Sequence, residues 1–588
     1  MQGGPPWISR TGRGMRLTRR GWIGASAALA GMSAAAGARA APVEEGADFP
    51  VGAFQVRSSG ARDYGPALAA LRGYARDELA AWGLPGMTLA VTDLDGFTAV
   101  LALGWADVDR RIAVDPGHYF QIGSISKSFI AQTILALGEQ GRIDVDAPVA
   151  RYLPDAPLPA EPITIAQVLS HTSGLPGDAE PFPRTRDGRL WCGFAPGTRF
   201  SYSNLGYGLL GRVIERVTGM PHPAAVTRYV RGKIGLGEVA GTISRARRDA
   251  FAVGYWPADR VAASTLPGAR LEFATWDEED NPAGSIGATS DQMAIYLHAL
   301  MHAGRGEDGP VLKAAAARRF TAPVIAAGAF GPGAQYACGV AVAPIDGSPT
   351  LHHTGGMMSF SSSFHADPAA GVACFASVNA RNGEYRPRKT TAYAVRLLRA
   401  VRAGTPLPPA PDPSAPLRFK DPTPYLGRFV SDTGEMVIEA SGDRVTVRSA
   451  GAAGRVAAED PDRLVTDHPG LALYGLDAIR QSGAVVGYWW GETLFGRDAP
   501  RARPAPADAL RPYAGAYLNR DPWIGGAAVL VRGDALVIDG QGRLIDRGGW
   551  WSVEKDVGGI ERIRFDAMLG GKACRMNVSG DDLWRIEV

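Results

Sequence analysis

The chain has 588 residues, of which 46% are hydrophobic and 21% charged, the composition of an ordinary globular protein with room for about three or four domains. Its formal net charge is +3, but residues 1–40 contain six arginines and neither lysine nor acid, so the remainder carries 3 − 6 = −3. This balance gives no indication of a nucleic-acid-binding surface, and we expect no nucleic-acid partner.

Residues 1–40 have the pattern of an export signal. An arginine-rich start precedes a weakly apolar stretch, Trp22 to Gly37, and a small-residue cleavage site, Ala38-Arg-Ala40. The segment Thr18-Arg-Arg-Gly-Trp-Ile23 resembles a twin-arginine signal, which exports folded proteins. We therefore expect signal removal, a periplasmic or secreted location and no stable membrane span in the mature protein. The alternatives are a disordered basic tail or a single membrane anchor.

The first predicted elements after the signal are two β-strands and a helix. Alternating residues at Thr88–Thr92 and Thr98–Ala102 flank Asp95-Gly96, which is typical of a hairpin. From Ser124 onward, apolar residues recur at helical spacing until Gly141, which provides a stop signal. The sequence therefore predicts a helix whose first turn contains Ser124.

Two further helices are predicted from their N-terminal signals. Thr164-Ile-Ala-Gln167 is a capping-box pattern that opens a short helix ending at His171. Ser290-Asp291 is expected to cap another helix. We expect His171 to stabilise the turn after its helix, with contact to substrate as the alternative.

Four strands are predicted late in this part of the chain. They are expected at Tyr336–Ala343, Thr350–Thr354, Ser359–Ala366 and Gly371–Val378, followed by a basic helix at Thr390–Val401. Strands at both ends with helices between them indicate one antiparallel sheet assembled from distant segments, flanked by helices.

The C-terminal third has a different composition and an internal repeat. Eight prolines in residues 404–424 indicate a semi-rigid linker. Beyond it, Tyr425-Leu-Gly-Arg-Phe429 recurs as Tyr513-Ala-Gly-Ala-Tyr517 at an offset of 88 residues. Each copy has short alternating strands and no convincing helix, so we predict two small all-β domains in tandem, either barrels or sandwiches.

These observations predict an α+β fold for the hydrolase domain, followed by two small all-β domains. The predicted parts are an export signal at 1–40, a hydrolase domain at 41–402, a linker at 403–424, and two β-domains at 425–500 and 513–588.

The four cysteines do not match a known metal-binding spacing, so we expect no metal site. We also expect no cofactor. A bridge between Cys338 and Cys374 would have to span three strand steps, ~14 Å, whereas a disulfide needs less than about 7 Å between Cα atoms. We therefore expect buried free thiols.

Chemistry is indicated by a serine and a lysine three residues apart, Ser124-Ile-Ser-Lys127. A serine hydroxyl is a weak nucleophile near neutral pH and needs a base within hydrogen-bond reach. Helical spacing places both side chains on one face, and burial near a helix N-terminus should lower the pKa of the lysine. Spacing alone is weak evidence, because Ser552 and Lys555 repeat it, although in a predicted strand where the two side chains face opposite sides.

Two later motifs follow the serine and lysine in a fixed order. Tyr202-Ser-Asn204 begins 78 residues after Ser124, and His353-Thr-Gly355 begins 151 residues after Tyr202. With Phe120-Gln-Ile-Gly before the serine and Leu169-Ser-His-Thr-Ser-Gly-Leu-Pro between, residues 61–402 resemble the serine β-lactamases and penicillin-recognising peptidases. The branch resembled contains class C β-lactamases, D-alanyl-D-alanine carboxypeptidases, D-aminopeptidases and related esterases. The resemblance implies a β-lactamase/transpeptidase-like sheet with a helical subdomain, and the β-domains resemble the lipocalin-like domains of D-aminopeptidases.

The resemblance also implies roles for individual residues. Ser124 would be the acylated nucleophile, Lys127 its proton acceptor or electrostatic partner, and Tyr202 a proton shuttle whose pKa the nearby ammonium lowers. The substrate would be bound by four residues of the second and third motifs, Asn204, His353, Thr354 and Gly355. The oxyanion hole would be formed by the N–H groups of Ser124 and Gly356.

His353 separates this chain from β-lactamases, which usually have lysine there. A permanent cation holds a substrate carboxylate, whereas the charge of a histidine is conditional. We therefore predict an exported serine hydrolase acting through an acyl-enzyme on small amides or peptides, with D-residue peptides as one candidate substrate class. The alternatives are an esterase, a β-lactamase or a non-catalytic sensor of β-lactams or peptides. We expect the β-domains to cover or shape the cleft.

Overall fold

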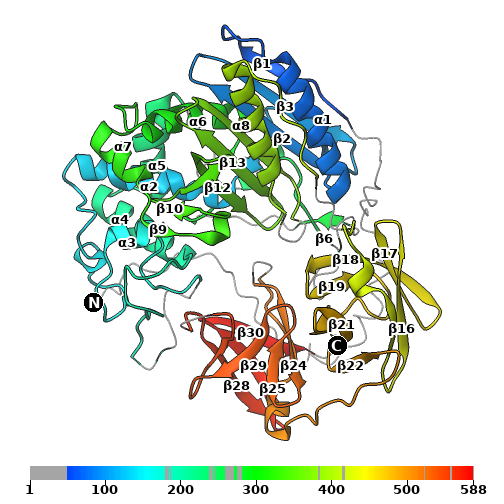
Figure 1. Cartoon of the computed structure of the whole chain (residues 1–588). Helices are drawn as coiled ribbons and strands as arrows, with labels where there is room; N and C mark the ends of the chain where they lie inside the picture. Colours follow the sequence, from blue (N-terminus) through cyan, green and yellow to red (C-terminus); the bar gives the residue numbers. More distant parts are fainter. Residues whose placement is uncertain are drawn as a thin grey trace. The chain divides into compact units, whose positions relative to one another are not determined.

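A computed structural model places the chain in one mixed domain followed by two barrels (Figure 1). The structure describes residues 50–586 apart from 179–184, 186, 237–242, 244, 258–265, 267–270, 275–280, 382–384, 414–416, 522–523 and 557–558. All of these belong to one unit, Ala40–Val588. The predicted export signal, residues 1–40, lies outside the described residues.

The mixed domain is built on one antiparallel sheet, as predicted, with strand order β1-β3-β2-β14-β13-β12-β11-β10-β9 and β4 paired to β3. Its strands are β1 (Gln55–Ser58), β2 (Gly86–Asp93), β3 (Thr98–Asp107), β4 (Ile112–Ala113), β9 (Ile325–Ala326), β10 (Gln335–Tyr336), β11 (Ala341–Ile345), β12 (Ser348–Gly356), β13 (Ser361–Asp367) and β14 (Val372–Val378). The predicted hairpin joins β2 and β3. The single strand predicted at Tyr336–Ala343 is wrong, because β10 and β11 are separated by a turn.

Both faces of the central strands are buried, which explains their continuous apolar sequence. On β14, Cys374 and Ala376 face a core shared with α1 (Gly65–Trp82) and α8 (Arg388–Ala403). Ala373 and Phe375 face the opposite core, which contains residues of α2 and α6. A strand with side chains alternating between two apolar cores must be apolar at every position.

Further helices, including the expected one after Thr164, lie in the sequence between strands β1–β4 and strands β9–β14. They are α2 (Ser126–Glu139), α3 (Ile165–Leu169), α4 (Asn204–Thr218), α5 (His222–Val226), α6 (Ser290–Gly304) and α7 (Ala314–Thr321). The predicted capping box of α3 is present, with Thr164 and Gln167 bonded reciprocally. The cap of α6 is Thr289 rather than the predicted Ser290, because the Thr289 hydroxyl accepts from Gln292 N–H. Within the described residues, no helix combines the length and apolar character needed to cross a bilayer.

The C-terminal repeats are two closed eight-stranded barrels, one of the two predicted all-β architectures. The first barrel contains β15 (Gly427–Val430), β16 (Glu435–Ser441), β17 (Arg444–Ser449), β18 (Ala452–Asp460), β19 (Arg463–Thr466), β20 (Leu476–Gln481), β21 (Ala484–Trp490) and β22 (Thr493–Arg497). The second contains β23 (Gly515–Leu518), β24 (Gly526–Arg532), β25 (Ala535–Ile538), β26 (Gly542–Asp546), β27 (Trp551–Val553), β28 (Ile563–Leu569), β29 (Lys572–Val578) and β30 (Asp581–Ile586). Each encloses an apolar cluster.

Buried ion pairs join the two barrels. Arg463 donates to both carboxylate oxygens of Asp539, at 3.2 and 2.9 Å, and Asp539 is only 4% exposed. Arg532 of the second barrel donates to Asp477 of the first at 2.7 Å. A carboxylate buried this deeply requires paired donors, so these contacts fix one barrel against the other.

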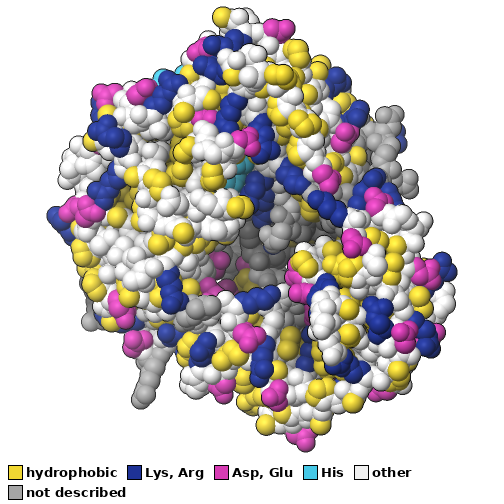
Figure 2. Space-filling view, in the orientation of Figure 1, with side chains coloured by type: hydrophobic (Ala, Val, Ile, Leu, Met, Phe, Trp, Pro, Cys, Tyr) yellow, Lys and Arg dark blue, Asp and Glu magenta, His cyan; other side chains and the backbone are white. Residues whose placement is uncertain are grey.

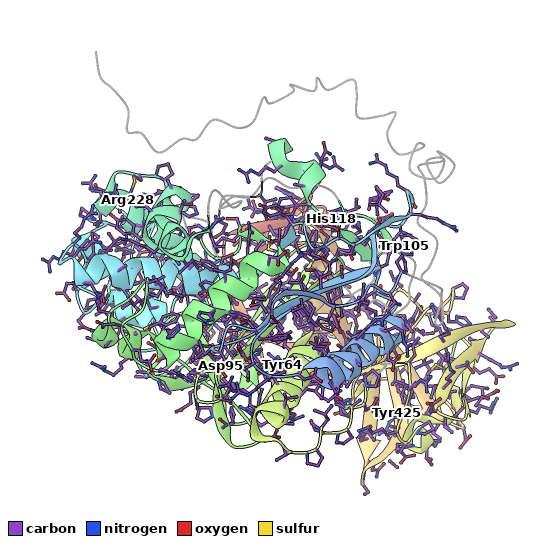
Figure 3. All side chains as sticks on the ribbon, turned by 90° about the horizontal axis from the view of Figure 1, so that it is seen from above. Tyr64, Asp95, Trp105, His118, Arg228 and Tyr425 are labelled. Atoms are coloured by element: carbon purple, nitrogen blue, oxygen red, sulfur yellow. The ribbon has the colours of Figure 1, made fainter. Side chains whose placement is uncertain are left out.

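Charged side chains cover the exterior without a single-sign patch on the face that Figure 2 shows, where blue and magenta side chains are interspersed. Asp95 and Tyr64, labelled next to each other in Figure 3, belong to one cluster of polar contacts. There, Arg402 donates to Asp95 at 2.9 Å, and the Tyr64 hydroxyl donates to Asp93 at 2.7 Å. The first bond ties α8 to the hairpin turn between β2 and β3, and the second ties the start of α1 to the end of β2.

Candidate active site

Ser124 lies in a single 3-10 turn, Gly123–Ile125, directly before α2. The sequence predicted it inside the helix, so the α-helix begins two residues later than expected. Gly123 has φ +54°, and a Cβ there would meet the Gly356 nitrogen at 2.8 Å. Glycine is required here both for the left-handed backbone and for this close approach. The turn thereby presents Ser124 beside the end of β12.

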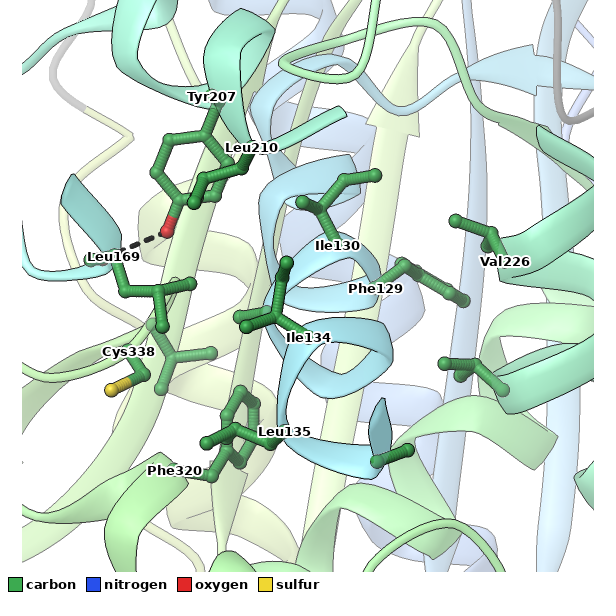
Figure 4. Packing of buried hydrophobic residues seen from close by; sticks show 14 of the residues in the cluster. Phe129, Ile130, Ile134, Leu135, Leu169, Tyr207, Leu210, Val226, Phe320 and Cys338 are labelled. Carbon is green, nitrogen blue, oxygen red and sulfur yellow. Dashed lines mark hydrogen bonds between the residues drawn. The ribbon is translucent and has the colours of Figure 1, made fainter. Parts of the chain in front are cut away.

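The α2 helix is anchored in the larger core of the domain. Figure 4 shows Phe129, Ile130 and Ile134 of α2 among buried apolar side chains of neighbouring segments. The Phe129 ring stacks on Tyr296 of α6 with centroids 3.9 Å apart. Helix packing of this kind holds the first turn of α2, and therefore Lys127, in a fixed position.

The Lys127 side chain is fully buried and has three hydrogen-bond acceptors. Its Nζ donates to Ser124 Oγ at 3.0 Å, to Asn204 Oδ1 at 2.7 Å and to the Ala283 carbonyl at 2.8 Å. In the usual ammonium form of lysine, the three N–H groups match these three acceptors. The structure therefore brings Ser124, Lys127 and Asn204 together.

Tyr202 and Asn204 are positioned by the start of α4. Ser203 is the N-cap, and its hydroxyl accepts from Gly206 N–H. The Lys127 ammonium lies 4.8 Å from the centre of the Tyr202 ring, so it faces the ring rather than the hydroxyl. The Tyr202 hydroxyl is buried without a hydrogen-bond partner of ordinary geometry among the described residues.

The pKa of Tyr202 differs from the expectation. Burial raises the pKa well above the usual value for a phenol, and the adjacent Ser124 hydroxyl offsets only part of the rise. The prediction of a lowered pKa was wrong because desolvation outweighs the two effects that lower it, the Ser124 hydroxyl and the charge of Arg386. Tyr202 is a neutral phenol in the free protein.

His353 lies on β12 behind the site rather than in it. It is 1% exposed, its Nδ1–H donates to the Thr354 carbonyl at 2.6 Å, and its Nε2 accepts from the Tyr336 hydroxyl at 2.9 Å. Burial and the Lys127 ammonium lower its pKa well below the usual value. The expectation that this side chain binds substrate does not fit a neutral imidazole with both nitrogens engaged.

A cavity of about 620 Å³ lies over Ser124. Of the predicted site residues, its wall includes Ser124, Asn204 and Gly356. The N–H groups of Ser124 and Gly356 remain the predicted oxyanion hole. Lys127 and Tyr202, like His353, Thr354 and Gly355, are not part of the wall.

The second barrel supplies much of the cavity wall, as expected for a domain that shapes the cleft. Four carboxylates line the cavity, Asp178 from the mixed domain and Asp521, Glu561 and Asp581 from the barrel. Among the described residues that line it, none is lysine or arginine. The described part of the cavity wall therefore carries acidic and no basic side chains.

Glu561 also joins the barrel to the segment beside Asn204. Its carboxylate accepts from Gly177 N–H at 2.7 Å and from the Ser579 hydroxyl at 2.5 Å. The Gly177 carbonyl in turn accepts from Asn204 N–H at 2.7 Å. Nearby, Trp191 Nε1–H donates to the Ile560 carbonyl at 2.7 Å. Sequence reasoning missed Asp178 and Glu561 because neither belongs to a motif.

The C-terminal repeat of the serine and lysine spacing is not a site. Ser552 lies on β27, is fully buried and accepts from Arg547 at 3.0 Å. In the described part of the chain, no group of three or more His, Cys, Asp or Glu side chains is placed to hold a metal ion. All four cysteines are free thiols, and Cys338 and Cys374 are buried as expected.

Comparisons with known proteins agree with this geometry. The family model described as beta-lactamase matches residues 71–398, more than half of the chain. The chain is 26% identical over 210 residues to protein flp of Staphylococcus aureus, covering 33% of this chain and 41% of flp. It is 29% identical over 179 residues to a beta-lactamase of Providencia stuartii, covering 29% of this chain and 46% of that protein. The aligned part thus spans less than half of either relative.

A solved structure shows the same fold. The octameric penicillin-binding protein homologue from Pyrococcus abyssi has a TM-score of 0.51 and 20% identity, and the match covers 73% of this chain and 99% of that one. The family model, the order of the three motifs and the contacts of Ser124 and Lys127 lead to one conclusion: this chain belongs to the beta-lactamase family.

Proposed function

We propose that the protein is an exported serine hydrolase that acts through an acyl-enzyme on small amides or peptides carrying a free amino group, of the D-aminopeptidase type. The observation that carries this proposal is the acidic wall of the cavity that Ser124 lines. Carboxylates near a nucleophile attract a cationic substrate and repel an anionic one. This choice separates an aminopeptidase from a carboxypeptidase, whose substrate ends in a carboxylate.

In the proposed reaction, Ser124 Oγ attacks the substrate carbonyl. Lys127 stabilises the charge that develops on Oγ, because its ammonium lies 3.0 Å away. Tyr202, a neutral phenol next to Ser124, accepts the serine proton as it donates its own proton to the leaving amine, and later helps to activate water. The N–H groups of Ser124 and Gly356 stabilise the oxyanion.

The described residues of the cavity wall include four carboxylates and no lysine or arginine, which supports an amine over a carboxylate. Arg386 lies behind Gly356 of this wall, where it donates to the Tyr385 carbonyl at 2.7 Å. His353 is buried and neutral, so it provides no charge for a substrate carboxylate. An ammonium about 4 Å from a partly exposed carboxylate gains on the order of 1–4 kcal/mol, depending on the local dielectric. We therefore expect a free amine to be preferred over its acetylated form by about tenfold or more.

The test compares D-alanyl and L-alanyl p-nitroanilides with their N-acetylated forms. We expect the free D-alanyl compound to have the highest kcat/KM. Asp178→Asn should reduce the preference for the free amine, whereas Asp534→Asn, at a carboxylate whose side chain is 88% exposed, should not. Equal turnover of free and acetylated substrates would contradict the amine specificity.

Intact-mass analysis tests the acyl-enzyme itself. A fluorophosphonate or a reactive β-lactam should add to the wild-type protein at Ser124 and leave Ser124→Ala unmodified. Absence of an adduct on the folded wild-type protein would contradict a serine hydrolase. Turnover of p-nitrophenyl esters without any amide turnover would assign the same residues to an esterase.

Export is supported by the arginine-rich start of the chain and by Ala38-Arg-Ala40. We expect cell fractionation to find the protein outside the cytoplasm, with Ala41 as its new N-terminus. Replacing Arg19 and Arg20 together by lysine should retain the precursor in the cytoplasm if the signal is of the twin-arginine type. Full-length protein in the cytoplasm of the unaltered strain would contradict export.

A further inference from the structure

His171 is a fully buried histidine in the turn after α3, with no role in the mechanism above. Its φ is +56°, in the left-handed region that residues other than glycine seldom adopt. Unfavourable backbone conformations persist where surrounding contacts over-determine them, often beside functional groups. The contacts that His171 makes therefore indicate which neighbouring residue its left-handed backbone conformation serves.

Two acceptors of His171 hold the residues on either side of Tyr202. The backbone carbonyl of His171 accepts from Ser201 N–H at 2.8 Å. Its ring Nδ1 accepts from Ser203 N–H at 3.1 Å. Because Ser203 is also the N-cap of α4, these two bonds set both the backbone of Tyr202 and the start of the helix that carries Asn204.

The ring of His171 also packs on the ring of Tyr202. The two centroids are 4.2 Å apart with an interplanar angle of 36°. Tyr207 and Tyr336 lie against other sides of the imidazole, at 5.1 and 4.9 Å. Tyr202 is thus held by its backbone neighbours and by its ring, with Lys127 also 4.8 Å from the ring centre.

The imidazole is neutral and its tautomer follows from these bonds. Nδ1 accepts a hydrogen bond, so the ring proton is on Nε2. Burial and the nearby Lys127 and His353 lower the pKa of His171 well below its usual value. Nε2 has no hydrogen-bond partner among the described residues, so the ring does not act as a proton relay to another side chain.

We propose that His171 is the positioning residue of Tyr202, holding the phenol beside Ser124 through the Ser203 bond and the ring contact. This role rests on two parts of the proposed function: Ser124 is the nucleophile, and Tyr202 transfers protons. It is independent of which amide or ester the protein hydrolyses.

Two substitutions separate the hydrogen bond from the ring contact. In His171→Asn, Oδ1 takes the place of Nδ1 as acceptor, and asparagine tolerates the left-handed conformation better than most residues. His171→Phe keeps an aromatic ring but leaves the buried Ser203 N–H without its acceptor. His468→Phe is the matched control, since His468 is 2% exposed and its Nδ1 likewise accepts from a backbone N–H, that of Gly470, in the first barrel.

The readout is the rate constant for fluorophosphonate labelling of Ser124, together with its final stoichiometry. Displacing a reacting group by about 1 Å can cost 10²-fold in rate, so we expect about that loss in His171→Phe with stoichiometry unchanged. His171→Asn should label at least tenfold faster than His171→Phe, and His468→Phe should label at the wild-type rate. A purely structural role would lower the stoichiometry or the melting temperature and leave the rate constant of the folded fraction unchanged.

A double-mutant cycle decides whether His171 acts through Tyr202. In a Tyr202→Phe background, His171→Phe should have little further effect on the labelling rate. Additive losses, wild-type labelling of His171→Phe, or no labelling of the wild-type protein would each overturn the proposal. Failure of every amide in the substrate panel, with Ser124 still labelled, would overturn the proposed function and leave this result intact.

Discussion

Glu78 on α1 is a buried acid whose ionisation should destabilise the mixed domain. It is 2% exposed, and its carboxylate accepts from the hydroxyls of Thr390 on α8 and of Tyr74, the latter at 3.5 Å. Burial raises its pKa from 4.5 to about 7, because the hydrogen bonds recover only part of the lost hydration. Glu78→Gln keeps the shape of the side chain and removes the charge.

The sign follows from proton binding. Between pH 4.5 and pH 7 the folded state holds a proton that the unfolded state has released, so the free energy of unfolding falls as pH rises. Proton binding by Glu78 contributes its full stabilisation of the folded state below pH 4.5, and this stabilisation is lost once pH passes about 7. A shift of this size corresponds to about 3 kcal/mol at 1.36 kcal/mol per pKa unit. As pH rises from 4.5 to 8, the free energy of unfolding of Glu78→Gln should therefore increase by about 3 kcal/mol relative to that of the wild type.

The assay is urea unfolding read by pulse labelling of Cys374, followed by peptide mass analysis. Cys374 is fully buried on β14, where it pairs with Val91 of β2, so its thiol reacts only when the sheet opens. Samples equilibrated at different pH values are all labelled at one pH, so that the reactivity of the thiol itself does not vary. Glu161→Gln, at an exposed carboxylate, is the control. An unchanged difference between Glu78→Gln and wild type across this pH range would refute the reasoning.

Three further predictions concern the site and the barrels. Lys127→Met should slow fluorophosphonate labelling of Ser124 by about 10²-fold or more, since it removes the buried ammonium; labelling at the wild-type rate would contradict its role. Glu561→Ala should slow labelling by about tenfold, because an unsatisfied Gly177 N–H costs about 1–3 kcal/mol; the melting temperature serves to check folding. Asp539→Ala should destabilise the barrels by about 3 kcal/mol in urea unfolding, since it leaves Arg463 without its most buried partner, and an unchanged midpoint would exclude a stabilising ion pair.

Much of the site was predictable because the motifs are local. Ser124 and Lys127 lie within one turn, so their contact depends on a helix that its own apolar spacing indicates. The capping box at Thr164 is equally local and was predicted correctly. The Ser290 cap was misplaced by one residue because adjacent Thr and Ser residues are both good caps, and packing selects between them.

Two of the predictions that failed, those for Tyr202 and His353, concern burial. Tyr202 and His353 each have a charge state set by desolvation, which depends on how many segments cover the side chain. The neutral phenol and the neutral imidazole follow from burial that no motif encodes.

The sequence by itself determined the family, the nucleophile with its lysine, the antiparallel sheet and the repeated all-β domains. These follow from short-range periodicity and from residues whose chemistry is tied to local spacing. Only the tertiary structure decided that His353 lies behind the site, that His171 holds Tyr202, and that the second barrel contributes three carboxylates to the cavity that Ser124 lines. The physical reason is that burial and contacts between residues hundreds of positions apart, such as Glu561 and Gly177, depend on packing rather than on local pattern.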